Sequence, residues 1–305
     1  MKSILISGIT GFVGKNLSSY LGDSIQGVSR VPILDRSISY DSLCKEILDR
    51  ASAFIHLAGK AHDLKNTSDE KDYFTVNTEL TIKLFTQFLE STCETFIYMS
   101  SVKAVADEVT GELQELVLPN PITAYGKSKL AAEEYLLAQE LPKGKRLYIL
   151  RPCMIHGPNN KGNLNLLYSF VANGIPYPFG KYQNQRSFVS VENLCFIIKE
   201  LIENKEIESG VYNIADDDTL SIMELVRIIG EVAGKSSKIL NIPKPIVNFI
   251  AKLGDILPLA VNSERVQKLT ENYCVSNKKI KNAIGKELPL TAKEGIEVTI
   301  RSFMK

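Results

Sequence analysis

The sequence lacks the charge imbalance that marks proteins binding nucleic acid or membranes. Its formal net charge is only +1, from 36 basic and 35 acidic residues dispersed along the chain. Such a balance gives no long-range attraction to a polyanion, so we expect neither nucleic acid nor a membrane as a partner. The sequence also shows no internal repeat, low-complexity tract or block of like charges. Together with an ordinary share of hydrophobic residues, these absences exclude a disordered chain.

Long hydrophobic runs and metal-binding patterns are missing too. No run reaches the roughly 18 apolar residues of a spanning helix, and the start MKSILISGIT has no cleavable signal core. Five cysteines and three histidines are scattered without paired spacing, which argues against a metal site and fits reduced thiols in a cytoplasm. The segment Ile246 to Leu259 is interpreted as an amphipathic helix on the body, with membrane or partner docking as the alternative.

The first 150 residues alternate short β-branched runs with helical patterns such as Tyr73 to Leu89. Continuous apolar runs separated by helices are typical of a parallel sheet that is buried on both faces. The pattern therefore predicts an α/β fold with a doubly wound, Rossmann-like parallel sheet. The predicted strands are Ser3 to Ser7, Ser24 to Val28, Ala53 to Leu57, Phe96 to Ser100 and Leu147 to Leu150.

After Arg151 the sequence becomes rich in proline and glycine, which is typical of loops that cover a ligand. We expect a dinucleotide-binding domain over residues 1–162, with a return segment near 188–216. Residues 163–187 and 217–305 then form a smaller C-terminal substrate lobe. Ser221 with Glu224, and Thr291 with Glu294, have the spacing of capping boxes and predict two helix starts there.

The first predicted strand ends in a glycine turn that is followed by a predicted helix from Phe12 to Leu21. Glycines allow a tight turn and close backbone approach, while the helix start offers unpaired N–H groups to a pyrophosphate. A mere tight turn is the alternative. The predicted cofactor contacts in this turn are Gly8, Thr10, Gly11, Phe12, Val13 and Gly14.

Tyr125 and Lys129 are four residues apart in a predicted helix and therefore share one face. An ammonium about 4 Å from the phenol contributes roughly 4 kcal/mol, or about three pKa units. We therefore expect Lys129 to bring the pKa of Tyr125 close to the working pH, as acid-base catalysis requires. Ser101 follows a predicted strand, and its hydroxyl can hold a substrate carbonyl. The predicted catalytic residues are Ser101, Tyr125 and Lys129.

Five motifs resemble, in order, the extended short-chain dehydrogenase/reductase family of the epimerase/dehydratase type. They are Gly8 to Gly14, His56 to Gly59, Ser100 to Lys103, Tyr125 to Lys129 and Arg151-Pro152. The resemblance covers essentially the whole chain and implies an NAD(P)-dependent oxidoreductase. It places Leu57, Ala58 and Gly59 beneath the cofactor, and Asn77 and Cys153 in its pocket. Asn77 could otherwise be an ordinary helix-start residue.

The second predicted strand ends at Ser29-Arg30, where a dinucleotide enzyme selects its cofactor. NAD selection usually uses an acidic side chain there, whereas an arginine can pair with a 2′-phosphate. We therefore expect NADP, with NAD as the alternative, and a solvated Arg30 as the simpler interpretation. Ser29 and Arg30 complete the predicted cofactor contacts.

The resemblance also implies a nucleotide-sugar substrate, such as a UDP-sugar, and a homodimer. It assigns substrate contacts to Asn163 and Leu164 at a helix start, and to Arg186 and Arg265, for which a surface salt bridge is the alternative. Dehydratases of this family carry an Asp-Glu pair where this chain has Val102 and Lys103, so dehydration is disfavoured.

Two reactions then remain, a 4-epimerase that keeps NAD bound and a 4-ketoreductase that consumes NADPH. Arg30 favours the reductase, and the sequence is similar to bacterial enzymes that form UDP-N-acetylquinovosamine from a UDP-4-keto-6-deoxy-N-acetylhexosamine. Departures at Ala104 to Ala106, and His156 in place of the usual tyrosine, bear on the sugar. A non-catalytic NADP-binding regulator is a remote alternative, because such relatives typically lose the tyrosine or lysine.

Overall fold

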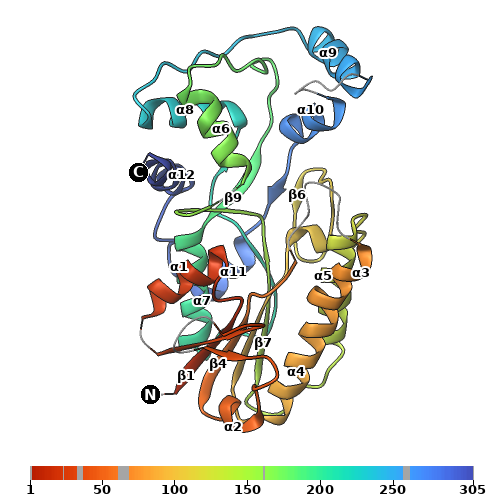
Figure 1. The fold of residues 1–305 in the computed structure, drawn as a ribbon, viewed down its shortest axis with the longest axis vertical. Coiled ribbons are helices and arrows are strands. Elements are labelled where there is room, and N and C mark those ends of the chain that lie inside the picture. The colour runs from red at the N-terminus through yellow and green to blue at the C-terminus, as the bar shows by residue number, and fades with distance from the viewer. Residues whose placement is uncertain are drawn as a thin grey trace.

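A parallel sheet forms the centre of the computed structural model, which describes residues 2–22, 24–32, 37–60, 69–160, 162–256 and 262–304. The strand order is β10-β7-β5-β4-β1-β2-β3, and every pairing is parallel. The strands are β1 (Ser3–Ser7), β2 (Ile25–Ser29), β3 (Ser37–Ser39), β4 (Ala51–His56), β5 (Thr95–Met99), β7 (Arg146–Pro152) and β10 (Gly210–Ile214). The order reverses between β1 and β4 (Figure 1), the point where open α/β sheets bind ligands. The predicted doubly wound fold is confirmed.

The five predicted strands are all present, and their bounds differ from the predicted ones by no more than two residues. Their side chains are buried almost throughout, because both faces of the sheet are covered by helices. The edge strands β3 and β10 were not predicted. Strand β3 has the polar sequence Ser-Ile-Ser and is only half-buried, so it has no apolar run by which to recognise it.

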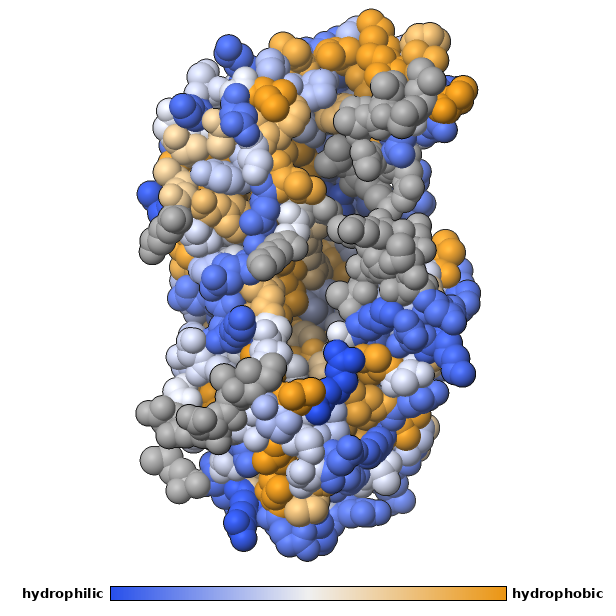
Figure 2. All heavy atoms as spheres, viewed as in Figure 1, coloured by the Kyte–Doolittle hydropathy of each residue, from blue (hydrophilic) through white to orange (hydrophobic). Residues whose placement is uncertain are grey.

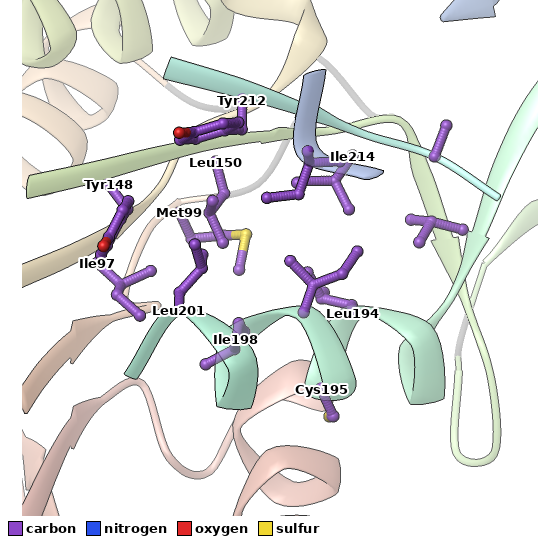
Figure 3. Close-up of a cluster of buried hydrophobic side chains, with 14 of the residues drawn as sticks. Ile97, Met99, Tyr148, Leu150, Leu194, Cys195, Ile198, Leu201, Tyr212 and Ile214 are labelled. Atoms are coloured by element: carbon purple, nitrogen blue, oxygen red, sulfur yellow. The ribbon is translucent and has the colours of Figure 1, made fainter. Parts of the chain in front are cut away.

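Helices cover the two faces of the sheet (Figure 1). One face carries α1 (Phe12–Leu21), α7 (Val191–Glu203) and α11 (Lys278–Ile284), and the other carries α2 (Lys45–Leu48), α4 (Leu80–Glu90) and α5 (Ala124–Leu137). Figure 3 shows Leu194, Ile198 and Leu201 of α7 pointing toward the sheet, while Cys195 points away from it. The apolar stripe of α7 thus forms one layer of the core.

The helix predicted over Tyr73 to Leu89 is interrupted. It consists of α3 (Glu70–Phe74), a π-helical turn over Thr75–Glu79 and α4. The π-helical turn contains Asn77, which is fully buried. Single π turns occur mainly at functional sites, since they redirect a side chain within a helix.

The second half of the chain builds a smaller lobe with its own hydrophobic core. Its helices are α6 (Asn163–Ala172), α8 (Ile222–Val232), α9 (Lys244–Ile256), α10 (Ser263–Thr270) and α12 (Ala292–Phe303). They surround the small sheet β11 (Thr219–Leu220), β9 (Arg186–Ser190) and β8 (Met154–His156). A further pair, β6 (Glu112–Leu113) with β12 (Cys274–Val275), links the two halves. The exact division at residues 162, 188 and 216 stays a prediction.

Both predicted capping boxes are confirmed. The Ser221 hydroxyl accepts from the N–H of Glu224 at the start of α8, and Thr291 does the same for Glu294 at α12. Each glutamate reaches back to the N–H of its capping residue. Helix α1 also has the predicted bounds, so local capping and glycine signals located these helix starts well.

Within the described ranges, none of the helices has the length and apolar character to cross a bilayer. Nor do the described histidines, cysteines and carboxylates gather into a group that could hold a metal ion. All five cysteines are free thiols.

Candidate active site

Helix α5 and the carboxyl end of β5 bring the three predicted catalytic residues together. The Thr123 hydroxyl caps α5 by accepting from the N–H of Gly126 at 3.2 Å. Lys129, on the same face of α5 as Tyr125, donates from Nζ to the main-chain oxygen of Met99, the last residue of β5, at 2.8 Å. Ser101 lies two residues further along and is hydrogen-bonded to Tyr125. The three predicted catalytic residues therefore form one site beside the point where the strand order of the sheet reverses.

The expected acidification of Tyr125 by Lys129 is wrong for this structure. Burial raises the pKa of Tyr125 above its ordinary value of 10.0, and the hydrogen bond from Ser101 lowers it by less. Lys129 contributes nothing that offsets the burial, because its ammonium is turned to the Met99 carbonyl and lies 4.8 Å from the centre of the Tyr98 ring. Tyr125 is therefore a protonated phenol at neutral pH.

Lys129 is the more perturbed of the two groups. Its side chain is buried, and this burial lowers its pKa from 10.5 to about 8, although the Glu133 carboxylate partly opposes the shift. Desolvation disfavours the ammonium relative to the neutral amine. Lys129 is thus the first of the three catalytic residues to lose its proton as the pH rises.

Glu133 extends the catalytic face of α5 by one further turn, and sequence reasoning did not find it. It is fully buried, accepts a hydrogen bond from the Ser100 hydroxyl and pairs with Arg151 of β7. The Arg151 Nε donates to Oε1 at 3.1 Å and Nη2 donates to Oε2, so the contact is bidentate. The available signal is the spacing Tyr125, Lys129, Glu133, which repeats every four residues.

The glycine turn has the close approach that a dinucleotide cradle needs. Gly8 has φ +73°, and a Cβ there would stand 2.7 Å from the main-chain nitrogen of Ala58. A Cβ at Gly14 would collide with the main chain of Gly8 and Ile9. A Cβ at Gly11 would meet the Gly8 oxygen at 3.2 Å and, among the other described residues beyond its chain neighbours, nothing else within 4 Å. The turn is therefore closely packed against the main chain at Gly8 and Gly14, whereas the side at Gly11 leaves room for a ligand.

The start of α1 has no side-chain cap, because its capping residue is Gly11. The first N–H groups of a helix have no partner within the helix and carry partial positive charge. Phe12 and Val13 supply such groups here, and Thr10 beside them is exposed. These residues fit the diphosphate of a nicotinamide dinucleotide, whose chemistry when bound is the transfer of a hydride.

Gly59 joins the cradle to the catalytic lysine. A Cβ at this position would stand 3.1 Å from Lys129 Nζ and 3.0 Å from Asn77 Oδ1. The Asn77 amide in turn accepts from the N–H of Lys60 at 2.8 Å and donates to the Ser128 hydroxyl at 3.0 Å. Asn77 is thus a bridge between the segment after β4 and α5, rather than an ordinary helix-start residue.

His56 is a second residue whose role the sequence did not reveal. Its Nε2 lies 2.9 Å from the Thr81 hydroxyl. Because that hydroxyl donates its own proton to the main-chain oxygen of Asn77, the proton between His56 and Thr81 must be on Nε2. Nδ1 then accepts from the Ser7 hydroxyl at 2.5 Å. Burial, followed by the charge of Lys129, lowers the pKa of His56 to about 3. This permanently neutral ring ties β1, β4 and α4 together beneath Leu57 and Ala58.

Arg30, which follows β2, lies near Tyr40. Arg30 is exposed, and within the described ranges it makes no ion pair. Its charge lowers the pKa of Tyr40, while burial, the larger effect, raises it. Tyr40 also hydrogen-bonds Ser7, and Ser29 donates from its hydroxyl to the Val31 oxygen. Arg30 and Tyr40 therefore lie close enough to interact, at the end of the strand where a cofactor ribose is recognised in this fold.

The predicted substrate contacts are more dispersed. Arg186 begins β9, is 16% exposed and pairs with Glu271 at 3.7 Å. Its charge reaches Cys153, which is buried in the core near the end of β7 and has its pKa raised by that burial. The Leu164 side chain is buried in the core of the smaller lobe, so only its main chain can meet a ligand. The side chains of Asn163 and Arg265 lie outside the described part of the structure.

Lys103 is the cation that faces Arg186 across Tyr273. Its Nζ donates to the Asp107 oxygen at 2.7 Å and lies 4.5 Å from the centre of the Tyr273 ring. The Tyr273 hydroxyl donates to the Ala106 oxygen at 2.7 Å. The two cations Lys103 and Arg186 therefore both act on Tyr273. Separately, Figure 2 shows a hollow in the surface between the two halves of the molecule. The two cations favour an anionic substrate.

Known proteins resemble this chain in sequence and in fold. The family model described as the NAD dependent epimerase/dehydratase family matches residues 4–215. A UDP-glucose 4-epimerase of Vibrio cholerae is 30% identical over 100% of this chain and 96% of its own length. An N-acetyl-alpha-D-glucosaminyl-diphospho-ditrans,octacis-undecaprenol 4-epimerase of Escherichia coli O157:H7 is 28% identical over 98% and 94%.

A GDP-6-deoxy-D-mannose reductase of Pseudomonas aeruginosa is 27% identical over 79% of this chain and 83% of its own. The solved structure of a UDP-glucuronic acid 4-epimerase from Bacillus cereus in complex with NAD has the same fold, with a TM-score of 0.75 and 18% identity over 99% and 98%. The resemblance read from the glycine turn and the Tyr125-Lys129 pair is confirmed. The chain belongs to the NAD dependent epimerase/dehydratase family and is an enzyme that uses a nicotinamide cofactor.

Proposed function

We propose that this enzyme reduces the C4 ketone of a UDP-4-keto-6-deoxy-N-acetylhexosamine with NADPH. The product is of the UDP-N-acetylquinovosamine type, a sugar donor for bacterial surface polysaccharide. The observation that carries the proposal is a protonated Tyr125 between Ser101 and Lys129, on a fold with an arginine at the end of β2. We place the reaction in the cytoplasm, where the free thiols stay reduced, and propose a homodimer from the family resemblance.

The protonation state of Tyr125 is compatible with reduction. A reductase needs its tyrosine to begin as an acid, and burial keeps this phenol protonated at neutral pH. With NADPH bound to supply the hydride, Tyr125 would give that proton to the C4 oxygen, so that the ketone becomes an alcohol. The tyrosinate that remains would be stabilised by the hydrogen bond with the Ser101 hydroxyl.

Arg30 supports the choice of NADP. An exposed guanidinium with no ion-pair partner in the described ranges can bind a 2′-phosphate by donating charge-assisted hydrogen bonds to it. Tyr40, beside it, offers an aromatic wall and a hydroxyl to the same ribose. Neither side chain repels the phosphate, whereas the carboxylate typical of NAD sites would do so.

Dehydration is disfavoured by the residues after Ser101. Val102 is buried, and the Lys103 ammonium is held by the Asp107 carbonyl and the Tyr273 ring. Eliminating water needs an additional acid and base near the sugar, and neither side chain can fill that role. A fixed cation here suits recognition of an anionic substrate instead.

A 4-epimerase that retains NAD is the alternative. It is favoured by the relative from Vibrio cholerae, which is named a UDP-glucose 4-epimerase and covers the whole chain. Epimerisation oxidises the sugar first, so its tyrosine must begin as a base.

A lipid-linked sugar is a second candidate substrate. The relative from Escherichia coli O157:H7 is named for a sugar diphosphate carried on undecaprenol. What favours such a substrate here is α9 in the smaller lobe, whose outer face exposes large apolar side chains. The chemistry at C4 would be the same, with a polyprenyl chain replacing uridine.

The proposal is tested with purified protein, NADPH or NADH, and a UDP-4-keto-6-deoxy-N-acetylhexosamine. We expect one NADPH to be consumed for each sugar reduced, with NADH much poorer. Tyr125→Phe should lower turnover at least about 100-fold while cofactor binding is nearly unchanged. Tyr135→Phe, on the same helix and half-buried, is the matched control and should keep full activity.

Interconversion of UDP-glucose epimers without net consumption of cofactor would establish the epimerase instead. Full turnover by Tyr125→Phe would overturn the catalytic assignment, whichever reaction is found.

A further inference from the structure

Helix α9 has an outer face that the fold leaves uncovered. Its thirteen residues lie at the end of the smaller lobe farthest from the central sheet (Figure 1). Val247, Ala251 and Gly254 are buried, and the first two pack into the core of that lobe. Large side chains occupy the adjoining face instead and are exposed: Ile246 by 50%, Phe249 by 63%, Ile250 by 41%, Leu253 by 39% and Ile256 by 82%.

These five side chains form one continuous stripe, which we call the α9 face. Their spacing of three, one, three and three residues places them within about 120° of a helix that turns 100° per residue. The view in Figure 2 shows apolar surface gathered at this tip of the molecule, over α9. A scattered exposed leucine needs no explanation, but a stripe of five on one short helix indicates a surface that is covered when the protein works.

Basic residues outnumber acidic ones in α9 and in the segment that precedes it. Residues 233–256 contain four lysines, at 235, 238, 244 and 252, all exposed, and a single acid, Asp255. The Asp255 carboxylate is already engaged, since it accepts from the N–H and the hydroxyl of Ser263. The whole chain carries only +1, so this lobe concentrates positive charge beside an apolar stripe.

We propose that the α9 face docks this enzyme on the surface of an anionic lipid bilayer. Helices that lie in a membrane interface combine an apolar face with lysines that reach phosphate headgroups. At 1.5 Å per residue, the thirteen residues of α9 measure about 20 Å, too short for the roughly 30 Å hydrocarbon core and suited to lying along its edge.

This proposal departs from the expectation of no membrane partner, which rested on the charge of the whole chain. The relevant quantity for a membrane surface is the charge within about a Debye length of the contact, near 8 Å at physiological salt. On α9 itself Lys244 and Lys252 outnumber the single acid Asp255, whose carboxylate is already hydrogen-bonded to Ser263. Docking would also hold the substrate lobe where lipid-linked sugars are made and used.

Vesicle flotation with the full chain tests the proposal independently of catalysis. We expect the protein to float with vesicles of phosphatidylglycerol and phosphatidylcholine, and far less with phosphatidylcholine alone. Phe249→Glu with Ile256→Glu should lower the bound fraction at least tenfold. Leu137→Glu, which charges a 54% exposed leucine at the end of α5, is the matched control and should float like the unmodified protein.

The lysines give a second, separate readout. Each lysine near an anionic surface changes partitioning about fivefold, so Lys244→Gln with Lys252→Gln should lower it roughly 25-fold and flatten its dependence on salt. Reduction of a water-soluble UDP-sugar should be unchanged in all of these variants, since none lies in the catalytic site. Failure of docking is therefore separable from failure of the proposed reaction.

Two results would overturn the proposal. One is equal flotation of the unmodified protein and the Phe249→Glu, Ile256→Glu variant, which would show that another surface binds lipid. The other is an unmodified protein that stays with the soluble fraction and forms an oligomer that the double variant dissociates. In that case the α9 face is an interface between copies of the chain.

Discussion

Glu133→Gln is the substitution that most directly tests how the active site is supported. Glu133 is fully buried one helical turn beyond Lys129 and holds the Arg151 guanidinium bidentately. Glutamine has nearly the same shape and can still accept one hydrogen bond, but it removes the negative charge. Arg151 then stays buried without an ionic partner, and its Nη1 already lacks a hydrogen-bond partner in the described structure.

The expected loss of stability is large. Removing one partner of a buried ion pair costs about 3–5 kcal/mol, because the other charge is left uncompensated. In a chain of this size each kcal/mol lowers Tm by about 2 °C, so we expect a fall of roughly 6–10 °C. Glu134→Gln is the matched control, since Glu134 is exposed on the same helix, and its Tm should be unchanged.

A residue that only stabilises the fold would change Tm alone, whereas Glu133 also affects the pKa of Lys129. The Glu133 carboxylate raises the pKa of Lys129 against the stronger lowering by burial, and the balance is about 8. Without it the pKa of Lys129 falls further. Because Tyr125 has a raised pKa, Lys129 is the catalytic group whose deprotonation sets the alkaline limb of activity. That limb should therefore move to lower pH in Glu133→Gln.

The assay is kcat/KM against pH with NADPH as the varied substrate, since this ratio reports groups of the free enzyme. The unmodified enzyme should lose activity as the pH passes about 8. An alkaline limb that stays in place in Glu133→Gln, while Tm falls, would refute the electrostatic part of the reasoning. An unchanged Tm would refute the buried-pair part.

Two further substitutions test the lysine and the glycine turn. Lys129→Met should abolish turnover yet raise stability at pH 7 by up to about 3 kcal/mol, because below pH 8 the folded state bears the whole desolvation of the ammonium. Between about pH 8 and 10.5 the unfolded state of the unmodified protein binds more protons than the folded state, so the free energy of unfolding rises with pH. This rise should vanish in Lys129→Met and persist in Lys127→Met, which thermal unfolding from about pH 7 to 10.5 can measure. Gly8→Ala should destabilise the protein more than Gly22→Ala in urea unfolding and weaken NADPH binding, because both positions have positive φ but only Gly8 meets main-chain atoms, at 2.7 Å. Equal losses would remove the argument from close approach.

Local signals in the sequence located most of the fold. Apolar runs buried on two faces identified the strands, and glycine or capping patterns identified α1, α8 and α12. These signals depend on a residue and its near neighbours in the chain, so one sequence is enough to read them. The edge strand β3 lacks such a signal, because its sequence Ser-Ile-Ser is polar and only half-buried.

The supporting network of the site could not be read in the same way. His56 is joined to Ser7 and Thr81, residues 49 and 25 positions away in the chain. Each of these side chains has several equally good partners in principle. Only the packing of β1, β4 and α4 decides which partner is met, and that packing is a property of the whole fold.

The error over Tyr125 has the same physical origin. The spacing of Tyr125 and Lys129 correctly placed them on one face of α5, but spacing carries no information about desolvation or the direction of the ammonium. In the folded protein burial outweighs the attraction, and the Met99 carbonyl takes the ammonium. The consequence is chemical: Tyr125 holds its proton at neutral pH, and the raised pKa of its phenol determines how readily that proton is given up.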